Sequence, residues 1–416
     1  MAILDTGSPF LIISNPNSNY CQSTGQCSIF ASYDPIQSTS AVWVSDDMNV
    51  VYELTSDAGS WFYDALSIGN GISVPTFPIG TANGSSTHDI QNTFGFGGAG
   101  GAGPNPDANT LQLLAKAGAI PSASIAMYLG ALDSTDGQAL FGGLDTSKWQ
   151  GNLSALPIVQ NENNEIQITL SSVALSDQDV TSDNLPVPVM VDTGNFDIKL
   201  PQDVVDAIWS RVGGIQAVNF SLGANSLPYG VCACSLAQSS DTVTFGFDGV
   251  SIVVPMSDLV LPPSQLVLQE AGLTDFPQDT CLFLINGWGP TAPQFSPFII
   301  GDAFLRNAYF VLDWDSNEVA LGQANNDGGD SNIITIAAGT SGLQDAIASA
   351  SSGQTSTGNP TSTAGAPSST ASASTVTGAP SPSATGGSSS NAASHLSQSG
   401  LILFGVTLFA TWSSWM

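Results

Sequence analysis

Two copies of one short motif carry the side chains of this sequence that are best suited to chemistry. They read Asp5-Thr6-Gly7-Ser8 and Asp192-Thr193-Gly194-Asn195, and each follows an apolar run. A single Asp-Thr-Gly is an ordinary turn after a strand. Here each copy is also followed by an apolar segment that contains glycine, at 94–97 and at 298–301. Motifs that repeat in the same order predict two related halves, each contributing one aspartate.

Two carboxyl groups brought together by such a repeat would act as an acid–base pair. Like charges at short distance resist ionising together, so the pair holds one shared proton and titrates in two steps. The unprotonated member can then accept a proton from water, while the protonated member donates to a carbonyl oxygen. The repeat therefore predicts Asp5 and Asp192 as catalytic residues of a water-based hydrolysis that is most effective in acid.

The elements that must position these aspartates are mostly strands. Residues 1 to 326 alternate short Val, Ile, Leu and Phe runs with Gly, Pro, Asn and Asp, a pattern typical of many short strands. Only 109–120 and 201–212 are convincing helical segments. The sequence thus predicts a mostly β protein.

Composition excludes several classes of function. The 416 residues include 5 Lys or Arg and 34 Asp or Glu, a formal net charge of -29. Such a chain repels phosphate backbones and anionic lipid surfaces, so we expect no nucleic-acid partner. In acid few cations would remain to repel one another, which suits an acidic environment. The Cys and His spacings make no convincing metal site, and we expect no metal and no cofactor.

The cysteines favour a secreted product. Cys21 and Cys27 have the close spacing of a small disulfide loop, one of the features expected in an oxidising compartment. Three glycosylation sequons, at Asn83, Asn152 and Asn219, are compatible with that route.

The C-terminal part differs sharply in composition. We expect 327–396 to be a disordered stalk, because most of it is Ser, Thr, Ala, Gly and Pro and no charged residue follows Asp345. The apolar end at 401–416 is shorter than the roughly 20 residues that span a bilayer. We therefore favour a glycosylphosphatidylinositol (GPI) attachment signal at 397–416 over a transmembrane helix, with Asn391 as the first choice of attachment residue and Ser390 as the second.

The N-terminal start does not match a secreted, lipid-anchored protein. Met1 is followed at once by the first motif, without a basic start or a long apolar signal. We expect the sequence to be truncated at this end.

With these motifs in place, the sequence resembles the pepsin-like aspartic endopeptidases, and its layout is similar to the fungal, surface-anchored yapsins. Segments matching the family in the expected order are 33–40, 139–158, 200–208 and 298–324, so the resemblance covers residues 1 to about 326. It implies a bilobal, mostly β acid-protease fold with lobes at 1–165 and 166–326 and an active-site cleft between them. It also implies hydrolysis of protein or peptide substrates by a monomer without a cofactor.

The resemblance assigns supporting roles around the two aspartates. Thr6 and Thr193 match threonines that form hydrogen bonds across the lobe interface, and Gly7 and Gly194 allow close backbone approach. Ser8 matches a hydroxyl that binds the outer oxygen of the first aspartate.

Further assignments come from the same resemblance. Tyr52 aligns with the tyrosine of the substrate-binding flap. Cys21 pairs with Cys27, and Cys281 pairs with Cys234 or Cys232, of which Cys234 fits the family context better.

Departures from the family pattern leave a second interpretation open. Asn195 replaces the usual Ser or Thr, Ile12 replaces a tryptophan that supports the flap tyrosine, and Glu53 and Thr55 replace flap glycines. A catalytically weak or inactive pepsin-like surface binding protein is therefore the alternative to an active endopeptidase.

Overall fold

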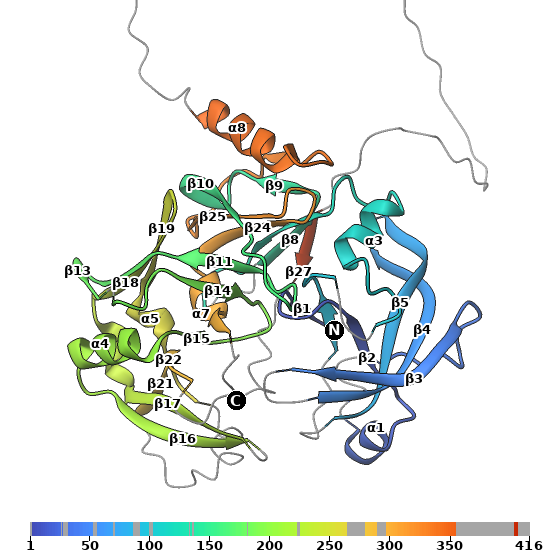
Figure 1. Ribbon diagram of the computed structural model, residues 1–416, viewed down its shortest axis with the longest axis horizontal. Coiled ribbons are helices and arrows are strands. Elements are labelled where there is room, and N and C mark those ends of the chain that lie inside the picture. The colour runs from blue at the N-terminus through green and yellow to red at the C-terminus, as the bar shows by residue number, and fades with distance from the viewer. Residues whose placement is uncertain are drawn as a thin grey trace, which may run out of the picture.

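The computed structural model describes most of the chain up to Gln354. The described residues are 2–25, 27, 32–52, 56–69, 71–85, 92–99, 103–132, 134, 137–180, 182–222, 225–263, 279–288, 297–354 and 403–406. Strands dominate them, and they form two lobes, blue on the right of Figure 1 and green to yellow on the left. The prediction of a mostly β, bilobal protein is confirmed.

The first lobe is built on a six-stranded sheet in the order β1-β6-β2-β5-β4-β3. Its strands are β1 (Ile3–Asp5), β2 (Leu11–Ser14), β3 (Val42–Val51), β4 (Ser56–Gly69), β5 (Ile72–Ser85) and β6 (Thr93–Gly95). β1 runs parallel to β6, β6 antiparallel to β2, and β2 parallel to β5. The antiparallel strands β3 and β4 extend this sheet toward its edge as a long hairpin.

The second lobe repeats that pairing pattern. Its central sheet has the order β11-β14-β23-β15-β22. The strands are β11 (Gln167–Leu170), β14 (Val187–Val191), β15 (Ile198–Lys199), β22 (Ile285–Asn286) and β23 (Phe298–Ile300). β14 runs parallel to β23, β23 antiparallel to β15, and β15 parallel to β22. The sequence repeat is therefore a structural repeat of four strands.

Two smaller antiparallel sheets complete the second lobe, in the orders β13-β12-β18-β19 and β16-β17-β21-β20. Their strands are β12 (Ser172–Leu175), β13 (Gln178–Asp179), β16 (Gln216–Leu222), β17 (Asn225–Ala233), β18 (Thr242–Phe247), β19 (Val250–Pro255), β20 (Val260–Leu261) and β21 (Thr280–Phe283). Their inner faces carry the apolar residues of the largest buried cluster, among them Phe245, Ile252 and Phe283.

One sheet joins the two halves of the chain, in the order β10-β25-β24-β7-β8-β27. Its strands are β7 (Ser124–Tyr128), β8 (Gly137–Phe141), β10 (Trp149–Pro157), β24 (Ala308–Asp313), β25 (Glu318–Ala324) and β27 (Leu403–Val406). β24 pairs with β7, and β25 with β10. Residues 308–324 thus leave their own half to complete a sheet of the other, which the linear division into 1–165 and 166–326 does not capture.

Both predicted helices are present. α3 (Thr110–Lys116) begins at a capping box between Asn109 and Gln112, and α4 (Gln202–Val212) follows Pro201. Shorter helical segments are α1 (Asn19–Thr24), α5 (Met256–Leu259), α7 (Asp302–Leu305) and the 3-10 turn η1 (Cys234–Gln238).

The predicted start of the stalk at 327 is wrong for residues 327–354. β26 (Ile333–Thr335) pairs with β9 (Gly143–Asp145), and α8 (Gly342–Gln354) follows it. Leu343, Ala346 and Ala350 are buried in one cluster with Trp149 and Tyr309 of the shared sheet. In Figure 1, α8 lies on the outer side of that sheet. Its apolar stripe is mostly alanine, so the helical period is weak in the sequence.

The remainder of the predicted stalk and signal lies outside the described residues, except for β27. Asn391 and Ser390 are among the residues that are not described. In the described ranges, no helix is long and apolar enough to cross a membrane.

Candidate active site

The two motif aspartates occupy equivalent places in the repeated strand pattern. Asp5 is the last residue of β1 and lies opposite Gly95 of β6. Asp192 directly follows β14, and its N–H donates to the Ile300 carbonyl of β23 at 3.2 Å. Each aspartate therefore begins the turn that follows the first strand of the repeated four-strand pattern.

The threonines of the two motifs tie these turns together. The Thr6 N–H donates to Thr193 Oγ1, and the Thr193 N–H donates to Thr6 Oγ1, both at 3.0 Å. Each hydroxyl donates in turn to a strand carbonyl of the opposite lobe, Thr6 to Val191 at 2.7 Å and Thr193 to Leu4 at 2.6 Å. Both side chains are almost fully buried. This reciprocal network holds the two aspartates, 187 positions apart, in one place.

The motif glycines bring each backbone up against the opposite carboxyl group. A Cβ atom on Gly7 would lie 2.5 Å from Asp192 Oδ1, and one on Gly194 would lie 2.5 Å from Asp5 Oδ1. Any other residue at these positions would therefore collide with a carboxylate. It follows that the carboxyl groups of Asp5 and Asp192 face each other across the lobe boundary.

The two carboxyl groups differ in their hydrogen bonds. Asp5 accepts from the Gly7 N–H at 2.7 Å and from the Ser8 hydroxyl. Burial raises the pKa of Asp5, and the hydrogen bonds from Ser8, Gly7 and the Asp192 carboxyl lower it only in part. Asp192 accepts from the Gly194 N–H at 2.8 Å.

Asn195, which stands at the place of Ser8 in the second motif, makes no amide hydrogen bond to Asp192 among the described residues. Asn195 Oδ1 accepts from the Asp197 N–H at 3.3 Å, and among the described residues Asn195 Nδ2 has no hydrogen-bond partner. The Asn195 side chain faces Asp197 in its own turn, so Asn195 does not give Asp192 the hydrogen bond that Ser8 gives Asp5.

Tyr52 directly follows β3, which ends at Val51. Burial raises the pKa of Tyr52, and the charges of Asp57 and Asp5 raise it further, while the Thr93 hydroxyl lowers it slightly. The hairpin tip, 53–55, lies outside the described residues, so the departures noted at Glu53 and Thr55 have no structural account.

The space near Ile12 is filled from a neighbouring strand. Ile12 and Trp61 of β4 are buried in one cluster with Met48, and Tyr52 packs against it. A Cβ atom on Gly80 would touch Ile12, Met48 and Trp61 at once. The indole that position 12 lacks is thus replaced by that of Trp61, which is 1% exposed.

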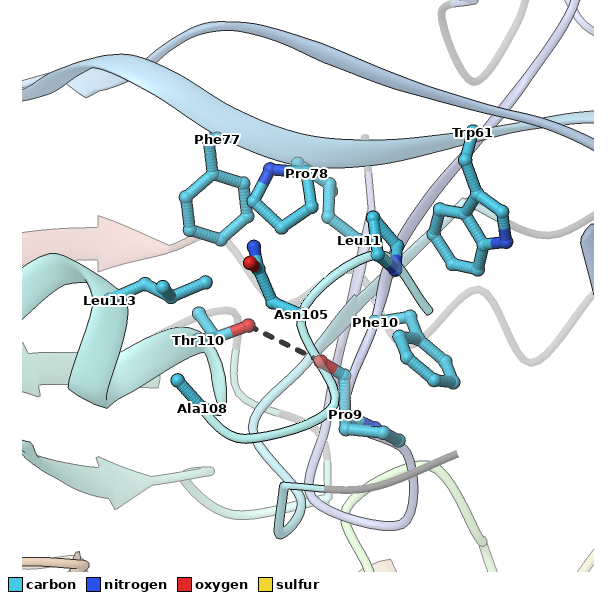
Figure 2. A pocket seen from close by; sticks show the side chains of 11 residues that line it. Pro9, Phe10, Leu11, Trp61, Phe77, Pro78, Asn105, Ala108, Thr110 and Leu113 are labelled. Carbon is cyan, nitrogen blue, oxygen red and sulfur yellow. Dashed lines mark hydrogen bonds between the residues drawn. The ribbon is translucent and has the colours of Figure 1, made fainter. Parts of the chain in front are cut away.

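Behind the first motif is a small apolar cavity (Figure 2). Phe10 and Trp61 line one side, with ring centroids 5.2 Å apart, and the Thr110 hydroxyl donates to the Pro9 carbonyl on the other. Its volume of about 20 Å³ is close to that of one water molecule. The cavity is therefore too small for a substrate side chain, and its walls support the turn after Ser8.

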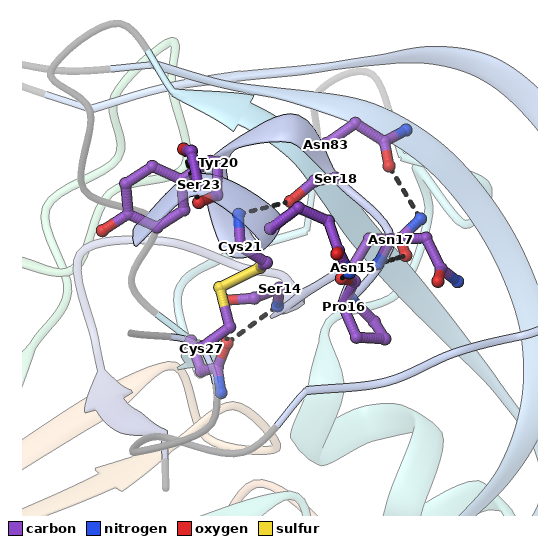
Figure 3. Close-up of a disulfide and its surroundings, with 12 residues drawn as sticks. Ser14, Asn15, Pro16, Asn17, Ser18, Tyr20, Cys21, Ser23, Cys27 and Asn83 are labelled. Atoms are coloured by element: carbon purple, nitrogen blue, oxygen red, sulfur yellow. Dashed lines mark hydrogen bonds between the residues drawn. A yellow bond between two sulfur atoms is a disulfide. The ribbon is translucent and has the colours of Figure 1, made fainter. Parts of the chain in front are cut away.

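Two disulfides connect the predicted cysteines. Cys21 and Cys27 close a loop beside β2 (Figure 3), and Cys234 is bonded to Cys281. Cys232 is buried with a free thiol. Cys232 is the cross-strand partner of Cys281 in the β17–β21 ladder. Because Cys232 and Cys234 are close in sequence, spacing alone left both pairings open.

Comparison with known proteins decides the family. The family model for eukaryotic aspartyl protease matches residues 1–324. The chain belongs to the eukaryotic aspartyl protease family. It is 33% identical to the probable aspartic-type endopeptidase opsB of Aspergillus oryzae, over 81% of this chain and 68% of that one. It is also 30% identical to secreted aspartic protease 3 of Candida albicans, over 77% of this chain and 75% of the relative.

Among solved structures, the aspartic proteinase from Irpex lacteus has the same fold. The TM-score is 0.61 at 20% identity, over 80% of this chain and 92% of that one. With the sequence relatives, this makes the protein an aspartic-type endopeptidase, a hydrolase that acts on protein or peptide substrates.

Sequence analysis missed one part of this aspartyl protease's site. Asp197 and Lys199 follow the second motif and form a buried ion pair at 2.8 Å. The sequence contains a signal for this pair, because two charged residues interrupt the otherwise apolar run from Phe196 to Leu200. In the described parts of the chain, no group of three or more His, Cys, Asp or Glu side chains could hold a metal ion.

Proposed function

We propose that the protein is an acid endopeptidase in which Asp5 and Asp192 activate a water molecule between them. The observation that carries the proposal is the mutual approach of Gly7 to the Asp192 carboxyl and of Gly194 to the Asp5 carboxyl. Two carboxyl groups held face to face in a buried site share one proton and titrate as a pair. That state combines a base and an acid at one point.

The reaction follows from this shared proton. The ionised carboxylate takes a proton from water, whose oxygen forms a bond to the carbonyl carbon of the scissile peptide. The other carboxyl donates its proton to the carbonyl oxygen, giving a tetrahedral diol. A proton then passes from the pair to the peptide nitrogen, and the C–N bond breaks. One diol hydroxyl returns its proton to the pair as the new carbonyl group forms, so a carboxylic acid and an amine leave. The dyad ends with its original single proton, so no cofactor enters the balance.

The supporting residues act on the dyad by holding it in place. Ser8 stabilises the ionised form of Asp5, and the threonine network fixes the separation of the two carboxyl groups. Tyr52 closes over an extended peptide bound between the lobes, since its phenol lies within the electrostatic reach of Asp5.

Cleavage of a mixed peptide library between about pH 3 and 6 tests this proposal, with Asp5→Asn and Asp192→Asn as separate variants. Each substitution removes one of the two carboxyl groups that share the proton, and it is expected to lower kcat by about 10³-fold or more. Asp177→Asn, an exposed carboxylate on a distant hairpin, is the matched control. Pepstatin should block the wild-type reaction. Unchanged cleavage in Asp192→Asn, or a folded wild type without cleavage, would favour the inactive binding protein instead.

We further propose that the protein enters the secretory pathway and is held at the cell surface by a GPI anchor, as a monomer. Two disulfides, a relative named as a secreted protease and the apolar end at 401–416 support this route. The sequon asparagines Asn83, Asn152 and Asn219 are exposed and can accept glycans. Release of surface protein by a phosphatidylinositol-specific phospholipase C tests the anchor. Loss of that release in Asn391→Gln, but not in Ser390→Gln, would identify the attachment residue.

A further inference from the structure

The second catalytic turn is followed by a buried ion pair that the proposed mechanism does not use. Lys199 is 1% exposed and Asp197 is fully buried, and Lys199 Nζ lies 2.8 Å from Asp197 Oδ2. The desolvation of two buried charges can exceed their mutual attraction, and well-packed apolar residues often serve stability equally well. A stability role alone is therefore a weak explanation for this pair.

The surroundings of the pair fix it in one geometry. Lys199 Nζ lies 4.2 Å from the ring centroid of Tyr229 and 5.5 Å from that of Trp288. Asn286 Nδ2 donates to Asp197 Oδ2 at 3.2 Å, and the Gly230 N–H donates to Asn286 Oδ1 at 2.7 Å. The ammonium is thus held by one carboxylate and lies over two aromatic rings.

Asp197 also connects this cluster to the catalytic turn. Its N–H donates to Asn195 Oδ1 at 3.3 Å, and its carbonyl accepts from the Gly301 N–H at 3.0 Å. Lys199 lies opposite Ile299 on β23, and Ile299 lies opposite Met190 on β14, the strand that ends at Asp192. The two residues of the pair are therefore joined through their backbones to both the turn and the sheet that carry the second aspartate.

The first lobe provides an internal comparison. Phe10 stands five positions after Asp5, as Asp197 stands five positions after Asp192, and Ile12 corresponds to Lys199. The Phe10 carbonyl accepts from the Gly95 N–H at 2.8 Å, the same backbone bond that Asp197 makes with Gly301. Apolar side chains are thus sufficient to build this turn. The charge pair is an addition specific to the lobe whose motif has Asn195 at the place of Ser8.

We propose that the Asp197–Lys199 pair is a positioning element for Asp192, which keeps the second catalytic turn fixed through Asn195, the residue that stands where the first motif has Ser8. The inference rests on the proposed role of the Asp5 and Asp192 dyad. Asp197 and Lys199 are positioning residues that act through the Asn195 turn, without contact to the substrate.

The test is a kinetic comparison of Lys199→Met with Lys148→Met. Lys148 also lies over an aromatic ring, at 4.9 Å from the Tyr128 centroid, but far from the motif in the sequence, in the turn that precedes β10. If Lys199→Met displaces the turn that carries Asp192, kcat should fall by about tenfold or more while KM changes less than about twofold. Lys148→Met should leave both constants unchanged. Wild-type kcat in Lys199→Met would overturn the proposal.

A second pair of variants separates positioning from folding. Asp197→Leu/Lys199→Met removes both charges and leaves no buried ion unpaired, so it should fold, yet it should keep the low kcat. Adding Asn195→Ser to this variant provides a hydroxyl for Asp192 and should recover most of the lost kcat. A folded double variant with wild-type kcat, or a loss that Asn195→Ser does not recover, would show that the pair is structural only. Titration with pepstatin measures the fraction of molecules that have an intact active site. Full activity of Asp192→Asn, measured in parallel, would contradict the proposed Asp5 and Asp192 dyad and not the positioning role.

Discussion

Thr6 and Thr193 donate their backbone N–H groups to each other's hydroxyl oxygens at the same distance, 3.0 Å. Each threonine comes from a different lobe, and each is buried. This relationship converts two separate strand ends into one site, because neither aspartate can move without breaking hydrogen bonds to the opposite lobe.

Thr6→Val tests this network. Valine has nearly the same shape but leaves the buried Thr193 N–H and the Val191 carbonyl without their partner, which should cost about 1–3 kcal/mol of unfolding free energy. Denaturant unfolding measures the loss, and kcat should fall as the aspartates separate. Thr6→Ser, which keeps the hydroxyl, is the control and should retain most of both quantities. Equal stability of Thr6→Val and wild type would contradict the role of the network.

The hydroxyl asymmetry of the motifs predicts opposite shifts in the pH profile. Ser8 stabilises ionised Asp5, so Ser8→Ala should raise the pKa of that carboxyl and move the acid limb of the kcat/KM profile upward, by on the order of one pH unit. Asn195→Ser adds a donor beside Asp192 and should move the same limb downward. The kcat/KM profile between about pH 2 and 6 measures both shifts. Shifts in the same direction would refute the assignment of donors.

Buried carboxyl groups predict that stability falls as the pH rises from 4 to 7. Burial raises the pKa of Asp302 from 3.8 to about 7, although the nearby Arg306 lowers it in part, and burial raises the pKa of Asp313 to about 6. Between these values the native state holds protons that the unfolded chain has lost, so each unit of pH destabilises the fold. The unfolding temperature should drop over this range, and less steeply in Asp302→Asn. A rise toward neutral pH would contradict this prediction.

Asp64 predicts the opposite behaviour at the acid end. Burial alone would raise its pKa, but the hydroxyl groups of Ser38, Ser40 and Tyr33 outweigh it and lower the pKa to about 2. This contribution to stability is complete above the unfolded value of 3.8 and is lost as the pH falls through about 2. Asp64→Asn should therefore lower the unfolding temperature at pH 5 but not at the acid extreme. Asp177→Asn, an exposed carboxylate, is the control at both pH values.

The helix α8 should contribute to the stability of the catalytic part. Leu343 is fully buried against the shared sheet, and replacing a buried Leu by Ala typically costs about 2–5 kcal/mol. Leu343→Ala should therefore lower the unfolding temperature measurably, whereas Ala348→Ser on the exposed face should not. If the two variants unfold alike, α8 does not belong to the cooperative unit.

Much of the fold and the centre of the site could be predicted from sequence. The strand content, the two helices α3 and α4 and the repeat of Asp-Thr-Gly all follow from local patterns, since periodicity and turn residues act over a few neighbours. The stalk boundary failed because α8 gains its stability by packing Leu343 and Ala346 on a distant sheet. Local composition carries little of that information.

By itself the sequence determined which residues could do the chemistry: two aspartates, each in a turn after an apolar strand, with glycine where close approach is needed. Only the tertiary structure decided how those turns are held. The burial of Lys199 between Tyr229 and Trp288 and the filling of the space at Ile12 by Trp61 depend on chain segments far apart in sequence. Such contacts are selected by packing and desolvation of the assembled lobes, which a linear pattern does not encode.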